Sequence, residues 1–132
     1  MSGPSPTIIP TLRYRDPAKA VAWLVDAFGF TEAFVAKGDD GSVGHAQLVH
    51  GTGMVMLGPV SDGSDDRLAA AHGPAWIYVI VDDIEAHYEQ AKAAGAELIR
   101  QLQEEGYGGK GYAVYDFEGN VWSFGTYHPE MP

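Results

Sequence analysis

DPAKAVAWLVDAFG at residues 16–29 and DDIEAHYEQAKAAG at residues 82–95 share one plan. Each begins with an aspartate, whose carboxylate can cap a helix, and ends with a glycine, which can take the left-handed conformation that stops one. In the first stretch Pro17 stands at the first helical position, and apolar residues recur at helical spacing: Ala20, Trp23, Leu24 and Ala27. The two stretches therefore predict two helices, offset by 66 residues in a chain of 132.

Short apolar or alternating runs flank each predicted helix and indicate strands. They lie at residues 8–14, 30–36, 45–50 and 54–57 in the first half, and at 75–81, 97–102, 111–115 and 121–127 in the second. The order strand, helix, three strands thus occurs twice, which is typical of an internal duplication. We predict one α+β domain over residues 1–132, built from two tandem βαβββ modules at about 7–58 and 75–127 with a surface crossover at 59–74.

The composition is that of a soluble globular chain, with 45% hydrophobic and 20% charged residues. There is no cysteine, which excludes disulfides, thiolate metal sites and a cysteine nucleophile. The net charge of −10 disfavours nucleic acid and anionic membranes as partners. The acidic field serves solubility or attracts a cationic small molecule. Since no signal-peptide pattern or membrane-length apolar run occurs, we expect a cytoplasmic protein.

Three segments, at residues 14–30, 81–96 and 116–125, together resemble the vicinal-oxygen-chelate superfamily of glyoxalases, bleomycin-resistance proteins and dioxygenases. The third, DFEGNVWSFG, is the most specific, because it is similar to the D-P-x-G-N-x-W-x-F-G segment of that superfamily, with Phe117 in place of proline. The resemblance spans essentially the whole chain. It implies that the modules form curved mixed sheets around a cavity, with the helices outside, and that the chain forms a homodimer.

The resemblance also implies where a metal would be held, because the superfamily's enzymes bind a divalent cation through His, Gln and Glu side chains on cavity-lining strands. In this sequence those positions fall at Ile9, Met56, Ala75 or Trp76, and Ser123. None of these residues offers an imidazole or a carboxylate. We therefore expect no metal and no cofactor there. His45 and His50 do not rebuild such a site, since residues five apart on a strand face opposite sides.

Without a metal, the predicted cavity would be lined by the inward side chains of each strand. Alternation places Trp76 and Tyr78 on one face and the aliphatic Ile77 and Val79 on the other, where helices pack. Aromatic walls suit a large, partly planar ligand, although the same rings could be core. The glycine-rich stretch at 106–111 is either a mobile loop over the ligand or a plain connector. The candidate ligand-binding residues are His45, Gln47, Met56, Trp76, Tyr78, Tyr107, Tyr112 and Ser123.

These observations favour a metal-independent binding protein over an enzyme. It would sequester a hydrophobic or aromatic natural product, as the bleomycin-resistance-type members do for antibiotics, and so provide antibiotic self-resistance. One alternative is a cofactor-free isomerase, cyclase or hydrolase that uses His45 as acid or base. Another is a metal-dependent glyoxalase-type lyase with relocated ligands.

Overall fold

The computed structural model describes residues 5–60, 73–106 and 108–132. The chain divides into two compact units, unit 1 at residues 1–72 and unit 2 at residues 73–132. Most of the predicted crossover, residues 61–72, and the candidate Tyr107 lie outside the described residues. None of the helices in the described ranges combines the length and the apolar character needed to span a membrane.

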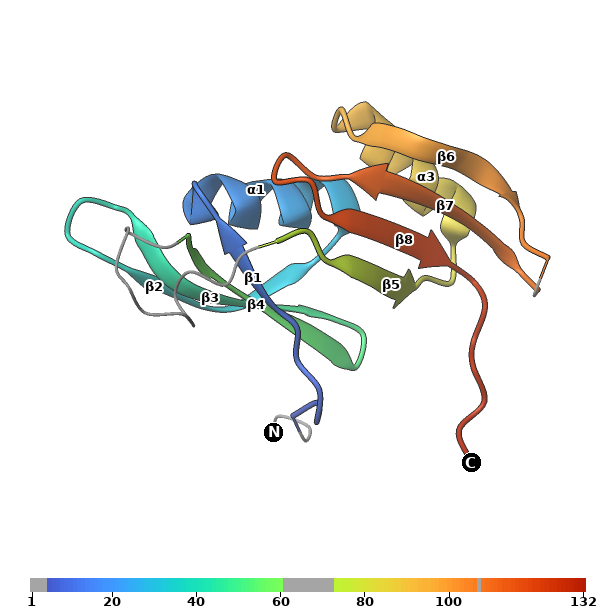
Figure 1. Cartoon of the computed structure of the whole chain (residues 1–132), viewed down its shortest axis with the longest axis horizontal. Helices are drawn as coiled ribbons and strands as arrows, with labels where there is room; N and C mark the ends of the chain where they lie inside the picture. Colours follow the sequence, from blue (N-terminus) through green and yellow to red (C-terminus); the bar gives the residue numbers. More distant parts are fainter. Residues whose placement is uncertain (1–4, 61–72, 107) are drawn as a thin grey trace. The chain divides into compact units, whose positions relative to one another are not determined.

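Unit 1 is a four-stranded mixed sheet with one helix (Figure 1). Its elements in chain order are β1 (Thr11–Tyr14), α1 (Pro17–Phe28), β2 (Thr31–Lys37), β3 (Val43–His50) and β4 (Gly53–Pro59). The strand order is β1-β4-β3-β2, with β1 parallel to β4 and the other pairs antiparallel. Helix α1 packs on one face of this sheet.

Unit 2 repeats this plan. Its elements are β5 (Trp76–Ile80), α3 (Ile84–Ala93), β6 (Glu97–Glu104), β7 (Lys110–Tyr115) and β8 (Val121–Gly125). The strand order β5-β8-β7-β6 again has one parallel pair, β5 with β8, and two antiparallel pairs. The predicted α+β fold with two βαβββ modules is therefore confirmed.

Helix α1 begins and ends where the sequence predicts. The Asp16 Oδ1 accepts a hydrogen bond of 3.1 Å from the backbone N–H of Lys19, and Pro17 follows the cap. Gly29 ends the helix at φ 77° and donates its N–H to the Val25 carbonyl. A side chain at this φ would be strained, which explains why glycine stands here.

Helix α3 corrects the predicted repeat by one residue. Its cap is Asp83, whose Oδ1 accepts from the N–H of Ala86 at 3.2 Å, whereas the side chain of Asp82 is 98% exposed. From cap to cap, Asp16 to Asp83, the offset is 67 rather than the predicted 66. The prediction of Asp82 as the cap is wrong, because two adjacent aspartates have identical side chains and the sequence does not distinguish them.

The register of the parallel strand pair follows the corrected offset in each unit, whereas the pair β2–β3 and its counterpart β6–β7 keep an offset of 66, as Thr31 with Val49 and Glu97 with Tyr115 show. Thr11 pairs with Met56 in unit 1, and Tyr78 pairs with Ser123 in unit 2, each 67 residues further along. The same offset matches Ile9 to Trp76, which settles the alternative between Ala75 and Trp76. The second module thus has one residue fewer between cap and glycine.

The turn between β7 and β8 explains the segment most specific to the resemblance. The buried carboxylate of Asp116 accepts four hydrogen bonds, from the backbone N–H groups of Glu118 and Asn120, the Asn120 amide and the Trp122 indole, at 2.9–3.0 Å. The Asn120 Oδ1 in turn accepts the N–H of Ala75 at 2.9 Å, just before β5. These residues close a turn and fix Trp122 in the core, so the segment is structural.

Candidate ligand-binding site

Each sheet has one face against its helix and one turned away from it, which we call the helix-free face. On β5 the side chains of Trp76, Tyr78 and Ile80 lie on the helix-free face of unit 2, where Trp76 is 76% exposed and the other two 37%. Ile77 and Val79 pair with the buried core residues Trp122 and Phe124. The predicted alternation along this strand is confirmed.

Trp76 is tied to Ser123. Its indole Nε1 donates a hydrogen bond of 2.7 Å to the Ser123 Oγ, and Ser123 itself is buried. The indole is therefore held by a hydrogen bond at one edge, although the residue is 76% exposed. An exposed aromatic ring with a fixed orientation is a preorganised surface for another ring.

Tyr78 lies beside Trp76 and covers a glycine of β8. A Cβ added at Gly125 would meet the Tyr78 hydroxyl at 2.8 Å and its Cε1 at 3.0 Å, so the phenol ring crosses the strand where no side chain stands. The hydroxyl donates to the carbonyl of Tyr127 at 2.8 Å. Both predicted aromatic residues of β5 are thus oriented by hydrogen bonds, Trp76 to the middle of β8 and Tyr78 to the carbonyl of Tyr127 beyond its end.

An ion pair on the same face was not predicted. The Arg100 Nη2 lies 2.6 Å from the Glu105 Oε1, and the Glu105 side chain is only 6% exposed, against 42% for Arg100. A Cβ at Gly111 would meet that Oε1 at 2.9 Å, so the carboxylate covers Gly111 as Tyr78 covers Gly125. No local pattern in the sequence indicates the pair, because β6 shifts register at Arg100 and Glu105 lies beyond the strand's end.

The prediction that Tyr112 binds the ligand is wrong, because its ring lies on the helix side of the sheet. It is fully buried, and its hydroxyl lies 2.6 Å from the His87 Nδ1 on α3. Its ring stacks on Phe124 at 5.3 Å between centroids. Burial, with a smaller contribution from the nearby Tyr88, raises the pKa of Tyr112 well above its ordinary value. Tyr112 is core.

The glycine-rich connector between β6 and β7 is anchored at its described residues. Glu105 donates its N–H to the Gly109 carbonyl at 2.8 Å, and Lys110 donates to the Thr126 Oγ1 at 3.0 Å. Gly109 has φ 73°, and a Cβ there would lie 2.5 Å from that oxygen, so only glycine fits. Of the two readings of this stretch, these contacts favour the connector.

The helix-free face of unit 1 carries the remaining candidates. His45 and Gln47 stand on β3 with the His45 Nε2 3.0 Å from the Gln47 Oε1, and Met56 pairs with Gln47 across the sheet. Phe34, 52% exposed, joins them, because a bulge in β2 pairs it with Gln47 and brings its ring 6.2 Å from that of His45. His50 faces the other way, toward the buried Phe30, as predicted.

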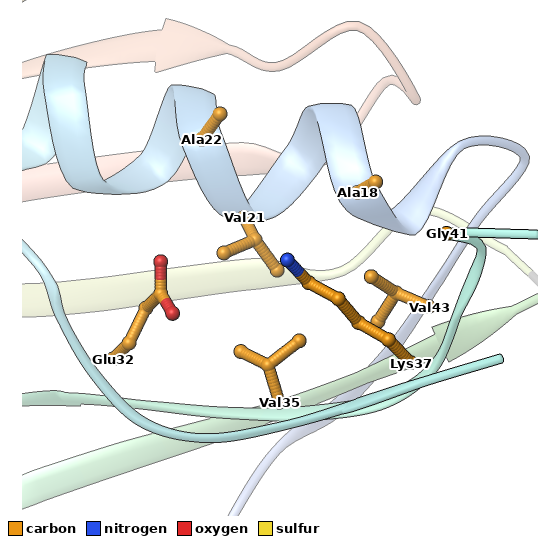
Figure 2. Close-up of a pocket in the computed structure, with 8 residues that line it drawn as sticks. All are labelled: Ala18, Val21, Ala22, Glu32, Val35, Lys37, Gly41 and Val43. Carbon is orange, nitrogen blue, oxygen red and sulfur yellow. The ribbon is translucent and has the colours of Figure 1, made fainter. Parts of the chain in front are cut away.

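A groove of about 220 Å³ opens on the opposite side of this sheet, between α1 and β2 (Figure 2). Val21, Val35 and Val43 form its apolar part, and Glu32 and Lys37 bring charge to it. It contains none of the predicted site residues. The groove is therefore separate from the helix-free face.

The metal positions implied by the resemblance do not fit a metal. In unit 2 the residues at the two implied metal positions, Trp76 and Ser123, are hydrogen-bonded to each other. In unit 1 these positions hold Ile9 and Met56. Within residues 5–60, 73–106 and 108–132, no three His, Asp or Glu side chains come close enough together to hold an ion. The donor set lacks the imidazole and carboxylate groups that such a site requires.

Comparisons with known proteins agree with this fold. The family model described as Glyoxalase/Bleomycin resistance protein/Dioxygenase superfamily matches residues 8–124. An uncharacterized protein of Mycobacterium bovis is 31% identical over 125 residues, which cover 91% of this chain and 82% of that protein. A counterpart in Mycobacterium tuberculosis has the same identity over 91% of this chain and 74% of its own length.

Solved structures extend the likeness. TioX from Micromonospora sp. ML1 superposes with a TM-score of 0.80 at 33% identity, over 93% of this chain and 98% of that one. A lactoylglutathione lyase from Agrobacterium tumefaciens superposes with a TM-score of 0.68 at 17% identity, over 94% of this chain and 95% of that one. The second likeness concerns the fold alone.

Proposed function

Because the chain belongs to the glyoxalase/bleomycin resistance protein/dioxygenase superfamily, we propose that it is a metal-independent protein that binds a hydrophobic, aromatic small molecule on the helix-free face of unit 2. The observation that carries the proposal is Trp76, which stands where the resemblance to the superfamily's metal enzymes places a metal ligand, is hydrogen-bonded to Ser123 and is 76% exposed. The site offers rings where the superfamily's enzymes offer an ion.

The physical case rests on the area that these rings would bury. A tryptophan can bury roughly 150–250 Å², and removing apolar area from water contributes about 25 cal/mol per Å². Because the Trp76 and Tyr78 side chains are already held by hydrogen bonds, little side-chain entropy is lost when a ligand covers them. A flat ligand stacked against Trp76 therefore keeps most of the free energy of burying the ring as binding free energy.

Biologically, we propose that the protein sequesters its ligand in the cytoplasm as a homodimer and confers resistance to an antibiotic natural product. Sequestration works by stoichiometry, so no reacting group is needed on this face. Sedimentation of the purified chain tests the dimer. A single monomeric species at micromolar concentration would refute that part.

The indole N–H signals provide a direct test of binding. The chain has three tryptophans; in a ¹H–¹⁵N spectrum, adding 2-naphthamide should shift the Trp76 signal, assigned by its loss in Trp76→Phe. The Trp122 signal, buried on Asp116, should stay in place and serves as the internal control. An unchanged Trp76 signal at millimolar 2-naphthamide would refute the proposed site.

One observation keeps an enzymatic alternative open. Because the Gln47 amide oxygen accepts from His45 Nε2, the neutral imidazole keeps a lone pair on Nδ1 and could act as a base. Recovery of more than one equivalent of a natural-product ligand in altered form, lost in His45→Ala, would favour this alternative. Quantitative recovery of unchanged ligand favours sequestration.

A further inference from the structure

The ion pair of Arg100 and Glu105 approaches the Tyr78 ring of unit 2, although β5 and β6 are the two edges of the sheet. Gly125 and Gly111 are direct partners in the β7–β8 register, so they stand one strand spacing apart, about 5 Å. The Tyr78 phenol covers Gly125, and the Glu105 carboxylate covers Gly111. The two glycines thus let side chains from both edges of the sheet approach each other over its middle.

The guanidinium in this pair has donors to spare. Arginine carries five N–H donors, and the bond to Glu105 uses one. The Arg100 side chain is 42% exposed, whereas that of Glu105 is 6% exposed. A molecule arriving on this face therefore meets the guanidinium rather than the carboxylate, which holds Arg100 in place.

The cation of β7, Lys110, does not lie on the helix-free face. Lys110, on β7, turns to the helix side, where its Nζ lies 3.1 Å from the Glu85 Oε1 of α3. Ala113 and Ser123, which lie between Arg100 and Tyr78 in the cross-strand row, carry no charge. Arg100 is therefore the charged side chain at the far end of the row that contains Tyr78, while Glu97 stands at the far end of the next row, which contains Trp76.

We propose that the helix-free face of unit 2 selects aromatic ligands that carry a hydrogen-bond-accepting oxygen, a carbonyl or carboxylate, which Arg100 binds while the ring stacks on Trp76. This inference rests on the proposed function. It makes Arg100 the specificity-determining residue and Glu105 its positioning residue. An aromatic amine is disfavoured because its ammonium would face the guanidinium.

Four naphthalene compounds test the selection, because they share a ring and differ in one group: 2-methylnaphthalene, 2-naphthamide, 2-naphthoate and 2-naphthylmethylammonium. Titration followed on the Trp76 indole signal should give the amide and the carboxylate an affinity about 10-fold or more above that of 2-methylnaphthalene, the range expected for a hydrogen bond to a charged donor. The ammonium compound should bind more weakly than 2-methylnaphthalene.

Arg100→Met should abolish the preference for oxygen while 2-methylnaphthalene still binds. Since that change leaves the Glu105 carboxylate buried without its partner, Arg100→Met/Glu105→Gln provides the same test without the stranded charge. Lys92→Met is the matched control, because it removes one positive charge of unit 2 from the exposed surface of α3, and it should keep the preference.

The outcomes separate the two proposals. Equal affinity for all four compounds, or an oxygen preference that survives both Arg100 variants, overturns the inference and leaves the proposed function standing. Failure of every compound to shift the Trp76 signal overturns the proposed function and the inference with it.

Discussion

A single carboxylate, that of Asp116, holds together the turn between β7 and β8. It accepts hydrogen bonds from two backbone N–H groups, an amide and an indole, and it is 5% exposed. Hydrogen bonds to a charged group are stronger than neutral ones, and a donor left buried without a partner is costly. Asp116 is therefore an anchor of unit 2.

Replacing Asp116 with alanine should lower the free energy of unfolding by about 3 kcal/mol or more, because the Trp122 and Asn120 donors lose their acceptor. Urea unfolding followed by tryptophan fluorescence measures the change. Asp39→Ala, at an exposed turn, is the control and should stay within about 0.5 kcal/mol of the parent. Equal effects of the two variants would contradict the structural role.

Tyr112 should make the protein sensitive to alkali. Its pKa is raised in the folded state by burial, so above the ordinary tyrosine pKa of about 10 the unfolded chain loses this proton while the folded chain keeps it. Stability from this group is fully present below pH 10 and falls as the pH rises further. Urea midpoints at pH 8, 10 and 11 should drop more steeply for the parent than for Tyr112→Phe; parallel curves would disprove this.

The sequence is informative about Asp116 and misleading about Tyr112. The residue types around Asp116 predict the turn in which it stands. Tyr112 follows a glycine-rich stretch, and only the register of β7 with β8, which pairs it with Phe124, shows that it faces the helix. Exposure of a ring cannot be predicted without knowing which face of the strand the helix covers.

At the scale of elements, the two helix starts show what local patterns can and cannot establish. Both helices and the order of all strands follow from period and punctuation, since each signal is local. The position of the second cap does not follow from these signals, because Asp82 and Asp83 have the same side chain and are adjacent in the sequence. The Arg100–Glu105 pair was missed for a related reason: a register shift is set by pairing, which is not local.

The neighbouring aspartates make the second cap testable. Asp83→Ala should cost about 1 kcal/mol of stability, because the Ala86 N–H loses its acceptor. Asp82→Ala changes the same side chain one position earlier, where it is exposed, and should cost little. Thermal unfolding of the pair measures the difference. A larger loss for Asp82→Ala would show that Asp82 rather than Asp83 caps the helix.

At the scale of the whole molecule, the net charge of −10 acts on stability as well as on partners. Like charges repel more strongly in the compact state than in the expanded one, and salt screens them. Raising NaCl from 0.02 to 0.3 M at pH 7 should therefore raise the urea midpoint. Near the isoelectric point of about 4.6 the same salt step should have little effect. A midpoint that falls with salt at pH 7 would show that specific ion pairs dominate instead.

The one-residue difference between the modules has a consequence for how this chain tolerates change in length. The second module has one residue fewer between helix cap and glycine and one more in the turn that joins its last two strands, where Ala113 and Ser123 stand one residue further apart than Gln47 and Met56. Within a paired strand, a single insertion would turn every following side chain to the other face. The two modules differ in length only at a helix end and a turn, so an engineered insertion should be accommodated at the same places.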